Sequence, residues 1–170
     1  MAVARFVLLS GGAQLFEIKD KNGAVLHQID GRRLDKANLA GLVLRGANLS
    51  GVGMTRAVLR KSDLCEADLS FANLASADLE QALLVRANLN CAMLIAASLA
   101  ECDLREANLR HASMFQANLR GARLERTSLL GTDLSSVDLT DANLMGAIYD
   151  ARTRWPDGFD PIAAGAVLKS

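Results

Sequence analysis

Leucine recurs at every fifth position through most of this 170-residue chain. Counted from Leu34 in steps of five to Tyr149, 21 of 24 positions are Leu, and the exceptions are Met54, Met114 and Tyr149 itself. Ala stands two residues before the counted position in 16 of the 24 cases, and Asn or Asp is usual between the two. The unit therefore reads Ala-(Asp/Asn)-Leu-x-x, and its frame does not slip over residues 32–151.

A period of five residues fits neither of the common backbones. On an α-helix, each step of five turns the leucine by about 140° around the axis, so no apolar stripe forms. On a β-strand, an odd step sends successive leucines to opposite faces of the sheet. The chain buries every leucine only if it turns a corner every five residues. The period thus predicts a solenoid, in which each coil buries its core against the next coil.

The repeat Ala-(Asp/Asn)-Leu-x-x resembles that of the pentapeptide repeat family. This resemblance implies an all-β fold, the right-handed quadrilateral β-helix, in which four repeats form one square coil. The 24 repeats of residues 32–151 then give a solenoid of about six coils. Within it, Leu94 and Leu104 are expected to be buried, whereas Arg105 is expected to point outward and to contribute little to stability.

The array is expected to carry a cap at its N-terminal end, formed by residues 1–31. Residues 15–29 contain two short apolar stretches on either side of a segment that includes Asn22 and Gly23. Asn-Gly between apolar stretches is a strong β-hairpin signal. A hairpin here would cover the first coil, because an uncovered solenoid end exposes leucines and unpaired backbone groups.

A second cap is predicted at residues 152–170. The repeat frame is expected to end after Ala151, because Arg154 would otherwise occupy a central site. Trp155 and Phe159 are best interpreted as a lid over the last coil rather than as an aromatic ligand site. Residues 162–168 would add a possible short helix.

The sequence offers little that suggests catalysis. It contains no Gly-x-Ser-x-Gly, no phosphate-binding loop and no Rossmann glycine pattern. The carboxylates Glu101 and Asp103 lie on a convex surface, where no cavity would shift their pKa values. Asn and Asp residues before the central leucine are interpreted as corner residues that hydrogen-bond nearby backbone. We predict a non-enzymatic protein with no catalytic residues, no cofactor and no metal.

The three cysteines are consistent with that prediction. Cys102 occupies an inward position of the repeat, whereas Cys65 and Cys91 occupy outward positions on different repeats. They are expected to be one core thiol and two incidental surface thiols, rather than a disulfide framework or a metal site. The apolar run within the first ten residues is too short for a secretory signal, and no run is long enough to span a membrane. The predicted localisation is cytoplasmic.

Written in rows of twenty, the outward positions fall on four faces. Face 1 is centred on Leu34, Met54, Leu74, Leu94, Met114 and Leu134. Its middle coils present Ala75, Met93, Ile95 and Phe115 and almost no charge. Face 2, centred on Leu39 and on every twentieth residue after it, carries charges of both signs. The uncharged part of face 1 is the candidate interaction face, because a contiguous apolar patch with a polar rim often marks an interface.

Two functional hypotheses follow. The first is an interaction scaffold whose outward side chains bind a partner protein or a second copy of the chain, as a homodimer. The second comes from the family resemblance, because some members bind DNA gyrase or topoisomerase IV as acidic imitations of DNA and protect against quinolones. Residues 32–151 carry 14 acidic and 13 basic side chains, whereas duplex DNA carries one charge per about 1.7 Å. This balance disfavours the second hypothesis.

Other partners are not expected. Acidic and basic residues are matched almost one for one, so no basic stripe forms for nucleic acid. Neither a membrane surface nor a small-molecule substrate is indicated. An enzymatic site would require an aromatic-walled pocket between Trp155, Asp157 and the last coil.

Overall fold

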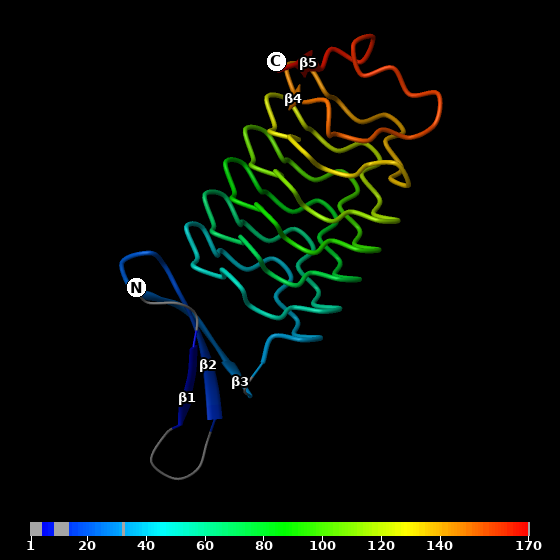
Figure 1. The fold of residues 1–170 in the computed structure, drawn as a ribbon. Coiled ribbons are helices and arrows are strands. Elements are labelled where there is room, and N and C mark those ends of the chain that lie inside the picture. Colours follow the sequence, from blue (N-terminus) through cyan, green and yellow to red (C-terminus); the bar gives the residue numbers. More distant parts are fainter. Residues whose placement is uncertain (1–4, 9–13, 32, 170) are drawn as a thin grey trace.

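The computed structural model describes residues 5–8, 14–31 and 33–169, and these form a rod of stacked coils with a small sheet beside its first coil (Figure 1). The described residues contain five short strands and no helix. The strands are β1 (Arg5–Leu8), β2 (Gln14–Lys19), β3 (Val25–Asp30), β4 (Ile148–Tyr149) and β5 (Val167–Leu168). The predicted repeat β-helix is confirmed as the architecture of the array.

The coils are built from parallel bridges between residues that lie 20 positions apart. These bridges run from Asn38 with Val58 to Ser128 with Ile148, and each face contributes a single bridged residue per coil. Leu94 illustrates the ladder, because its N–H donates to the Ser113 C=O at 2.7 Å. Four five-residue units therefore complete one turn of the chain. Faces 3 and 4 are centred on Leu44 and Leu49, respectively, and on every twentieth residue after each.

The corners explain why Asn and Asp precede the central residue. At the six positions Asn73, Asn88, Asn108, Asn118, Asp133 and Asp138, a side-chain oxygen accepts the N–H two residues on, at 2.9–3.3 Å. The residue two positions after the centre then takes a left-handed conformation, as in Ala96 (φ 54°). Sixteen such corners of the described chain use a residue other than glycine. The predicted corner role of these Asn and Asp side chains is confirmed.

The core is a column of leucines beside columns of small residues. Leu94 and Leu104 are both fully buried, which confirms the assigned frame. Where a polar residue replaces the inward Ala, its side chain donates to a backbone carbonyl: Thr127 Oγ1 bonds the Leu104 C=O at 2.7 Å, and Thr132 Oγ1 bonds that of Leu109 at the same distance. A buried hydroxyl that is hydrogen-bonded avoids most of its desolvation cost.

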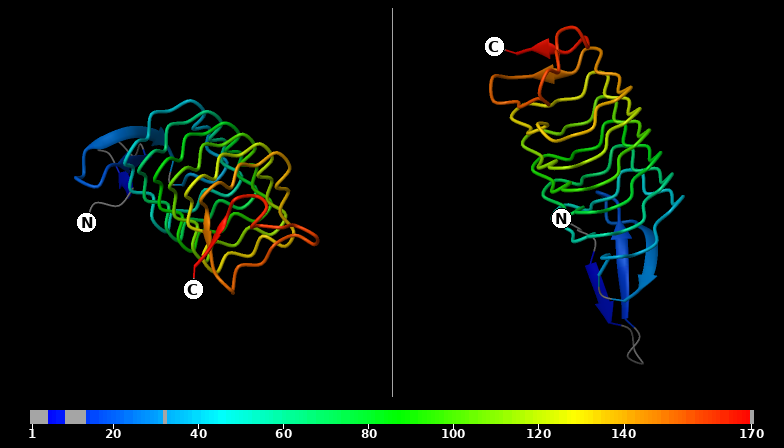
Figure 2. Two further views of the ribbon diagram at one scale, coloured as in Figure 1. Left: turned by 90° about the horizontal axis from the view of Figure 1, so that it is seen from above. Right: turned by 90° about the vertical axis from the view of Figure 1, so that its right-hand side faces the viewer.

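The sheet beside the first coil is antiparallel, in the order β1-β2-β3. β2 and β3 form the hairpin that was predicted for residues 15–29, and β1, which lies within the first ten residues, adds to its edge. Phe16 and Ile18 of β2 are buried in the same core cluster as the leucines. The Lys19 C=O also accepts the Asn48 N–H at 2.7 Å, so the sheet is bonded to face 4 of the first coil. Figure 2 shows the sheet at this end of the rod.

At the opposite end, the frame slips by one residue instead of ending after Ala151. Arg154 bridges to Asp133, 21 residues earlier, and its C=O accepts the Leu134 N–H at 2.8 Å. Thr153 takes the inward position, and its hydroxyl bonds the Leu129 C=O at 2.9 Å. Trp155, rather than Arg154, therefore follows in the place of the central residue, half-buried against the core.

The remaining C-terminal segment also differs from its prediction. Residues 161–165 form turns rather than a helix, and β5 then pairs in parallel with β4. A single bond from the Ala164 N–H to the Asp160 C=O has helical spacing. Gly165 interrupts the segment with a left-handed φ of 83°, and the two residues after Ala166 join the sheet as β5. A run this short does not repay the cost of helix nucleation.

Candidate interaction surfaces

Face 1 carries the predicted patch of exposed apolar side chains. Met93 is 41% exposed, Ile95 39% and Phe115 56%, whereas Ala75 is half-buried. The Ser76 N–H donates to the Ile95 C=O and the Ala96 N–H to the Phe115 C=O, both at 2.8 Å. Ala75, Ile95 and Phe115 are therefore consecutive members of one column, a single coil apart.

Faces 2 and 3 carry charges that pair with one another. On face 2, Arg60 contacts Asp78 at 3.0 Å and Glu80 at 2.8 Å. On face 3, Arg86 Nε lies 2.8 Å from a Glu106 carboxylate oxygen in the next coil. Exposed pairs of this kind add little stability. Their functional consequence is that neither face presents a continuous field of one sign.

The sequence pattern did not predict the ion pairs that Asp103 forms on face 3. Arg105 grips its carboxylate through two hydrogen bonds of 2.7 and 2.6 Å, and Arg123 lies 3.5 Å away. Burial alone would raise the pKa of Asp103, but these guanidiniums and the Arg105 N–H hold it below its ordinary value. Arg105 neutralises a carboxylate that is only 8% exposed, so its replacement is now expected to lower stability, in contrast to the expectation from its outward position alone.

Face 4 presents an amide ladder and one exposed aromatic side chain. Asn88 Nδ2 donates to Asp68 Oδ1, and Asn108 Nδ2 donates to Asn88 Oδ1, each at 3.0 Å. Phe71, at a left-handed corner beside this ladder, is 62% exposed. Phe71 does not belong to the predicted patch. Its exposure could have been predicted, because the arrangement of the sequence in rows of twenty places it in an outward column of face 4.

The cysteines depart from expectation at one position. Cys102 is a fully buried core thiol, as predicted, and its burial raises its pKa to about 12. Cys65 is also buried, which corrects its assignment as a surface thiol. The 20-residue stacking places Arg45 and Val85 on either side of it, and these larger side chains cover the small one. Burial raises the pKa of the Cys65 thiol as well; all three cysteines are free.

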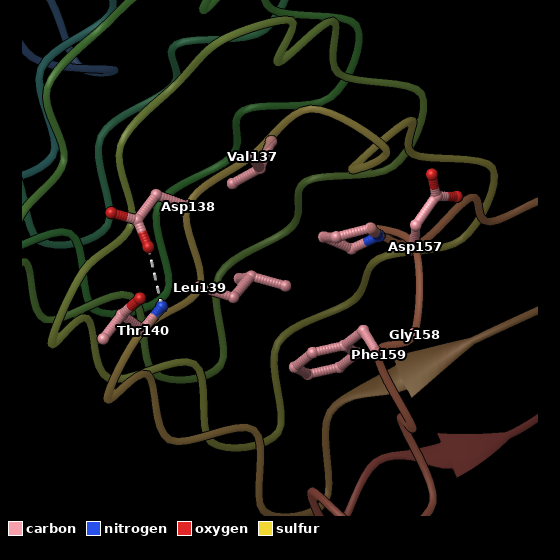
Figure 3. A pocket seen from close by; sticks show the side chains of 8 residues that line it. Val137, Asp138, Leu139, Thr140, Asp157, Gly158 and Phe159 are labelled. Atoms are coloured by element: carbon pink, nitrogen blue, oxygen red, sulfur yellow. Dashed lines mark hydrogen bonds between the residues drawn. The ribbon is translucent and has the colours of Figure 1, made fainter.

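The C-terminal aromatic residues form a packed cluster. The rings of Trp155 and Phe159 stack with centroids 5.2 Å apart, and Trp155 meets Tyr149 edge to face at 5.4 Å. Trp155 Nε1 is buried and has no hydrogen-bond partner among the described residues. Beside this cluster lies a cavity of about 400 Å³ whose lining includes Asp157 and Leu139 (Figure 3). Phe159 is the aromatic residue that lines this pocket, and Trp155 is not among its lining residues.

This pocket has no arrangement of side chains suited to catalysis. Its titratable residues, Asp138 and Asp157, are both exposed. Hydrogen bonds with Thr140 lower the pKa of Asp138, which therefore stays ionised. Across the described ranges, no group of three or more His, Cys, Asp or Glu side chains is placed to hold a metal ion. None of the described residues forms a helix that would span a bilayer.

Solved structures similar to this chain include several repeat proteins. A pentapeptide repeat protein of Nostoc PCC 7120, alr5209, is 36% identical, with 63% of this chain and 84% of that chain covered and a TM-score of 0.38. HetL of the same cyanobacterium, involved in heterocyst differentiation regulation, is 32% identical over 69% of this chain and 55% of its own, also with a TM-score of 0.38.

The plasmid-mediated fluoroquinolone resistance protein QnrB1 is 16% identical over 79% of this chain and 81% of its own, with a TM-score of 0.33. No curated protein is significantly similar to the chain. The pentapeptide repeats pattern matches in eight copies over residues 33–70, 72–110, 87–125 and 112–148, which is more than half of the sequence. The chain therefore belongs to the pentapeptide repeat family.

Proposed function

We propose that this protein is a non-enzymatic interaction scaffold, and that face 1 binds a partner protein or a second copy of the chain. The observation that carries the proposal is the contiguous exposure of Met93, Ile95 and Phe115. A partner that covers this apolar column removes it from water, and this burial stabilises the complex by about 25 cal/mol per Å² of apolar surface. The proposal treats the array as six square coils between the end segments 1–31 and 152–170, in the cytoplasm.

The alternative function is a DNA-mimicking inhibitor or protector of DNA gyrase or topoisomerase IV. The likeness to QnrB1 is a likeness of fold only. Against this alternative stand the near-neutral array and the carboxylates of faces 2 and 3, many of which already pair with arginines, as Glu106 does with Arg86. A mimic of DNA needs unpaired negative charge along its length. The scaffold is therefore the function that we favour.

The test is the double variant Ile95→Lys with Phe115→Glu. Both side chains point outward, so folding is expected to survive, and circular dichroism checks it. Sedimentation velocity and capture of partners from the native host are expected to show loss of self-association or of specific partners. Phe71→Glu is the matched control, because it removes an exposed phenylalanine from face 4. Glu66 already occupies the equivalent left-handed corner of the preceding unit, so this conformation accepts a glutamate. If the double variant sediments and captures partners as the wild type does, face 1 has no such role.

A further inference from the structure

The last coil leaves the backbone edge of face 2 open. In the coil beneath, the Leu119 N–H donates to the Asp138 C=O and the Gly121 N–H to the Thr140 C=O, both at 2.9 Å. The equivalent groups one coil later are the N–H groups of Leu139 and Asp141, and the described residues provide neither with a backbone acceptor. The Val137 C=O likewise receives no backbone N–H from the described chain. These three groups point toward the position of a further strand.

The C-terminal segment continues the ladder on faces 1 and 4. It supplies face 1 through the bond from the Leu134 N–H to the Arg154 C=O, and face 4 through the bond from the Val167 N–H to the Ala147 C=O at 2.7 Å. At the centre of face 3, the described residues provide the Leu144 N–H with no backbone acceptor either. Beside face 2, residues 156–159 instead line the far side of an open surface pocket of about 400 Å³ (Figure 3). The open edge and the cavity therefore form one groove.

The groove has an apolar interior and an acidic rim. Leu139 and Val137 form the apolar side that belongs to the last coil, and Phe159 faces Leu139 across the cavity (Figure 3). Stacking on Trp155 fixes the position of the Phe159 ring. Asp138 and Asp157 are exposed at the rim, and no basic side chain lines the groove. Arg120, in the coil beneath, is the cation that acts on Asp138.

The repeat itself specifies which strand would fit. Each strand of face 2 places a small residue and a leucine inward, with one outward residue between them, as in Ala117-Asn118-Leu119. A strand added above residues 137–139 would continue both inward columns. Its outward residue would lie above Asp138, where a lysine or arginine has a carboxylate partner. The best occupant thus has the sequence small-basic-leucine.

We propose that this groove binds an extended peptide segment of a partner protein, of the pattern small-basic-leucine, which adds in parallel to residues 137–141. Main-chain hydrogen bonds would supply affinity and the inward pocket specificity, as in other strand-addition sites. The site is independent of the patch on face 1. A second copy of this chain is a poorer occupant, because its first coil offers Ala37-Asn38-Leu39, which lacks the basic residue.

The test titrates the full chain with the peptide acetyl-Lys-Ala-Lys-Leu-Thr-Lys-amide. Trp155 is the only tryptophan of the chain and contacts Phe159, so its fluorescence reports occupancy. Saturable binding is expected, with NMR shifts at the amides of Leu139 and Asp141. A peptide N-methylated at the lysine between Ala and Leu is expected to bind at least about tenfold more weakly, because that N–H would donate to the Val137 C=O.

Protein variants separate the groove from the rest of the surface. Phe159→Ala is expected to weaken peptide binding by about tenfold, and the control Ile162→Ala, which truncates a side chain that is 70% exposed, is expected to leave it unchanged. The Ile95→Lys, Phe115→Glu variant is also expected to bind the peptide normally, so failure of the face 1 scaffold would not affect this result.

Three outcomes would overturn the proposal. The first is no saturable change up to about 2 mM peptide, and the second is equal binding of the N-methylated peptide. The third is a shift of the Leu139 and Asp141 amides with protein concentration alone, together with a rise in sedimentation coefficient, which would assign the groove to a second copy of the chain.

Discussion

Asp103 remains ionised although it is largely buried. Its partners Arg105 and Arg123 lie in the same coil and in the next one, so the carboxylate joins two coils through charge-assisted hydrogen bonds. Because its pKa in the folded protein lies below the ordinary value of 3.8, the folded state binds this proton more weakly than the unfolded chain does. The resulting stability is complete above about pH 5 and is lost as the pH falls through 3.8 and below.

Asp103→Asn tests this coupling. We expect the variant to be less stable than wild type by about 1–2 kcal/mol at pH 7, because it leaves two guanidiniums without their carboxylate. The difference is expected to shrink between pH 5 and pH 2, where wild-type Asp103 takes up its proton. Urea unfolding at several pH values measures it. An Asp103→Asn deficit that persists at pH 2 would refute the ion-pair account.

The corner is the element that makes the coil possible. Each of these corners contains a left-handed residue, many also have an Asx hydrogen bond, and the left-handed conformation costs a residue other than glycine about 1 kcal/mol. Sixteen of the described corners have a residue other than glycine in this conformation. The ladder and the leucine column therefore overcome the local preference of the backbone at every one of these positions.

Ala96→Gly is expected to remove this cost at one corner. Ala96 has a φ of 54°, and glycine adopts this conformation without a Cβ penalty, so we expect stability to rise by about 0.5 kcal/mol after the larger entropy of unfolded glycine is counted. The matched control Ala100→Gly lies at a neighbouring outward position outside the set of left-handed residues, and should lower stability by about 0.5–1 kcal/mol. Equal changes in the urea midpoint would contradict the strain argument.

The whole molecule is a one-dimensional stack, so its ends are its most vulnerable parts. The β1-β2-β3 sheet contacts the first coil, and the segment after Ala151 contacts the last. Each interior coil is bonded to the coils before and after it. In such stacks, stability is approximately a sum of coil terms and neighbour terms, and an uncovered end loses one neighbour.

Deletion of residues 152–170 is expected to cause aggregation or end-to-end polymerisation. It removes Trp155 and Phe159 from the core and leaves β4 without β5. Exposed edges of this kind template pairing with other chains. Size-exclusion chromatography and thermal melting measure the effect, for which we expect a fall in Tm of at least about 5 °C. A monodisperse truncated protein with the wild-type Tm would show that the segment does not protect the last coil.

Most of the fold followed from local chemistry that repeats. The leucine column, the inward alanines and the Asx corners each depend on residues within one five-residue unit, and these were predicted. The burial of Cys65 and the contact of Asp103 with Arg123 depend on residues 20 positions away, and the place of Trp155 depends on a slip in the frame, so the pattern of single units did not predict them. The exposure of Ile95 and Phe115 was predictable because both are outward and neighbour few large side chains.

The constant 20-residue coil makes the spacing between surface sites a quantity that changes only in whole steps. Insertion or removal of one complete coil between the two sites would change the distance between the groove beside Leu139 and the patch at Ile95 by about 4.8 Å. The arrangement of residues within each site would not change. A partner with two contact segments would then discriminate between pentapeptide rods by their length, because bivalent binding is strong only when both segments reach their sites at once. The number of coils would therefore set the distance between the two binding sites.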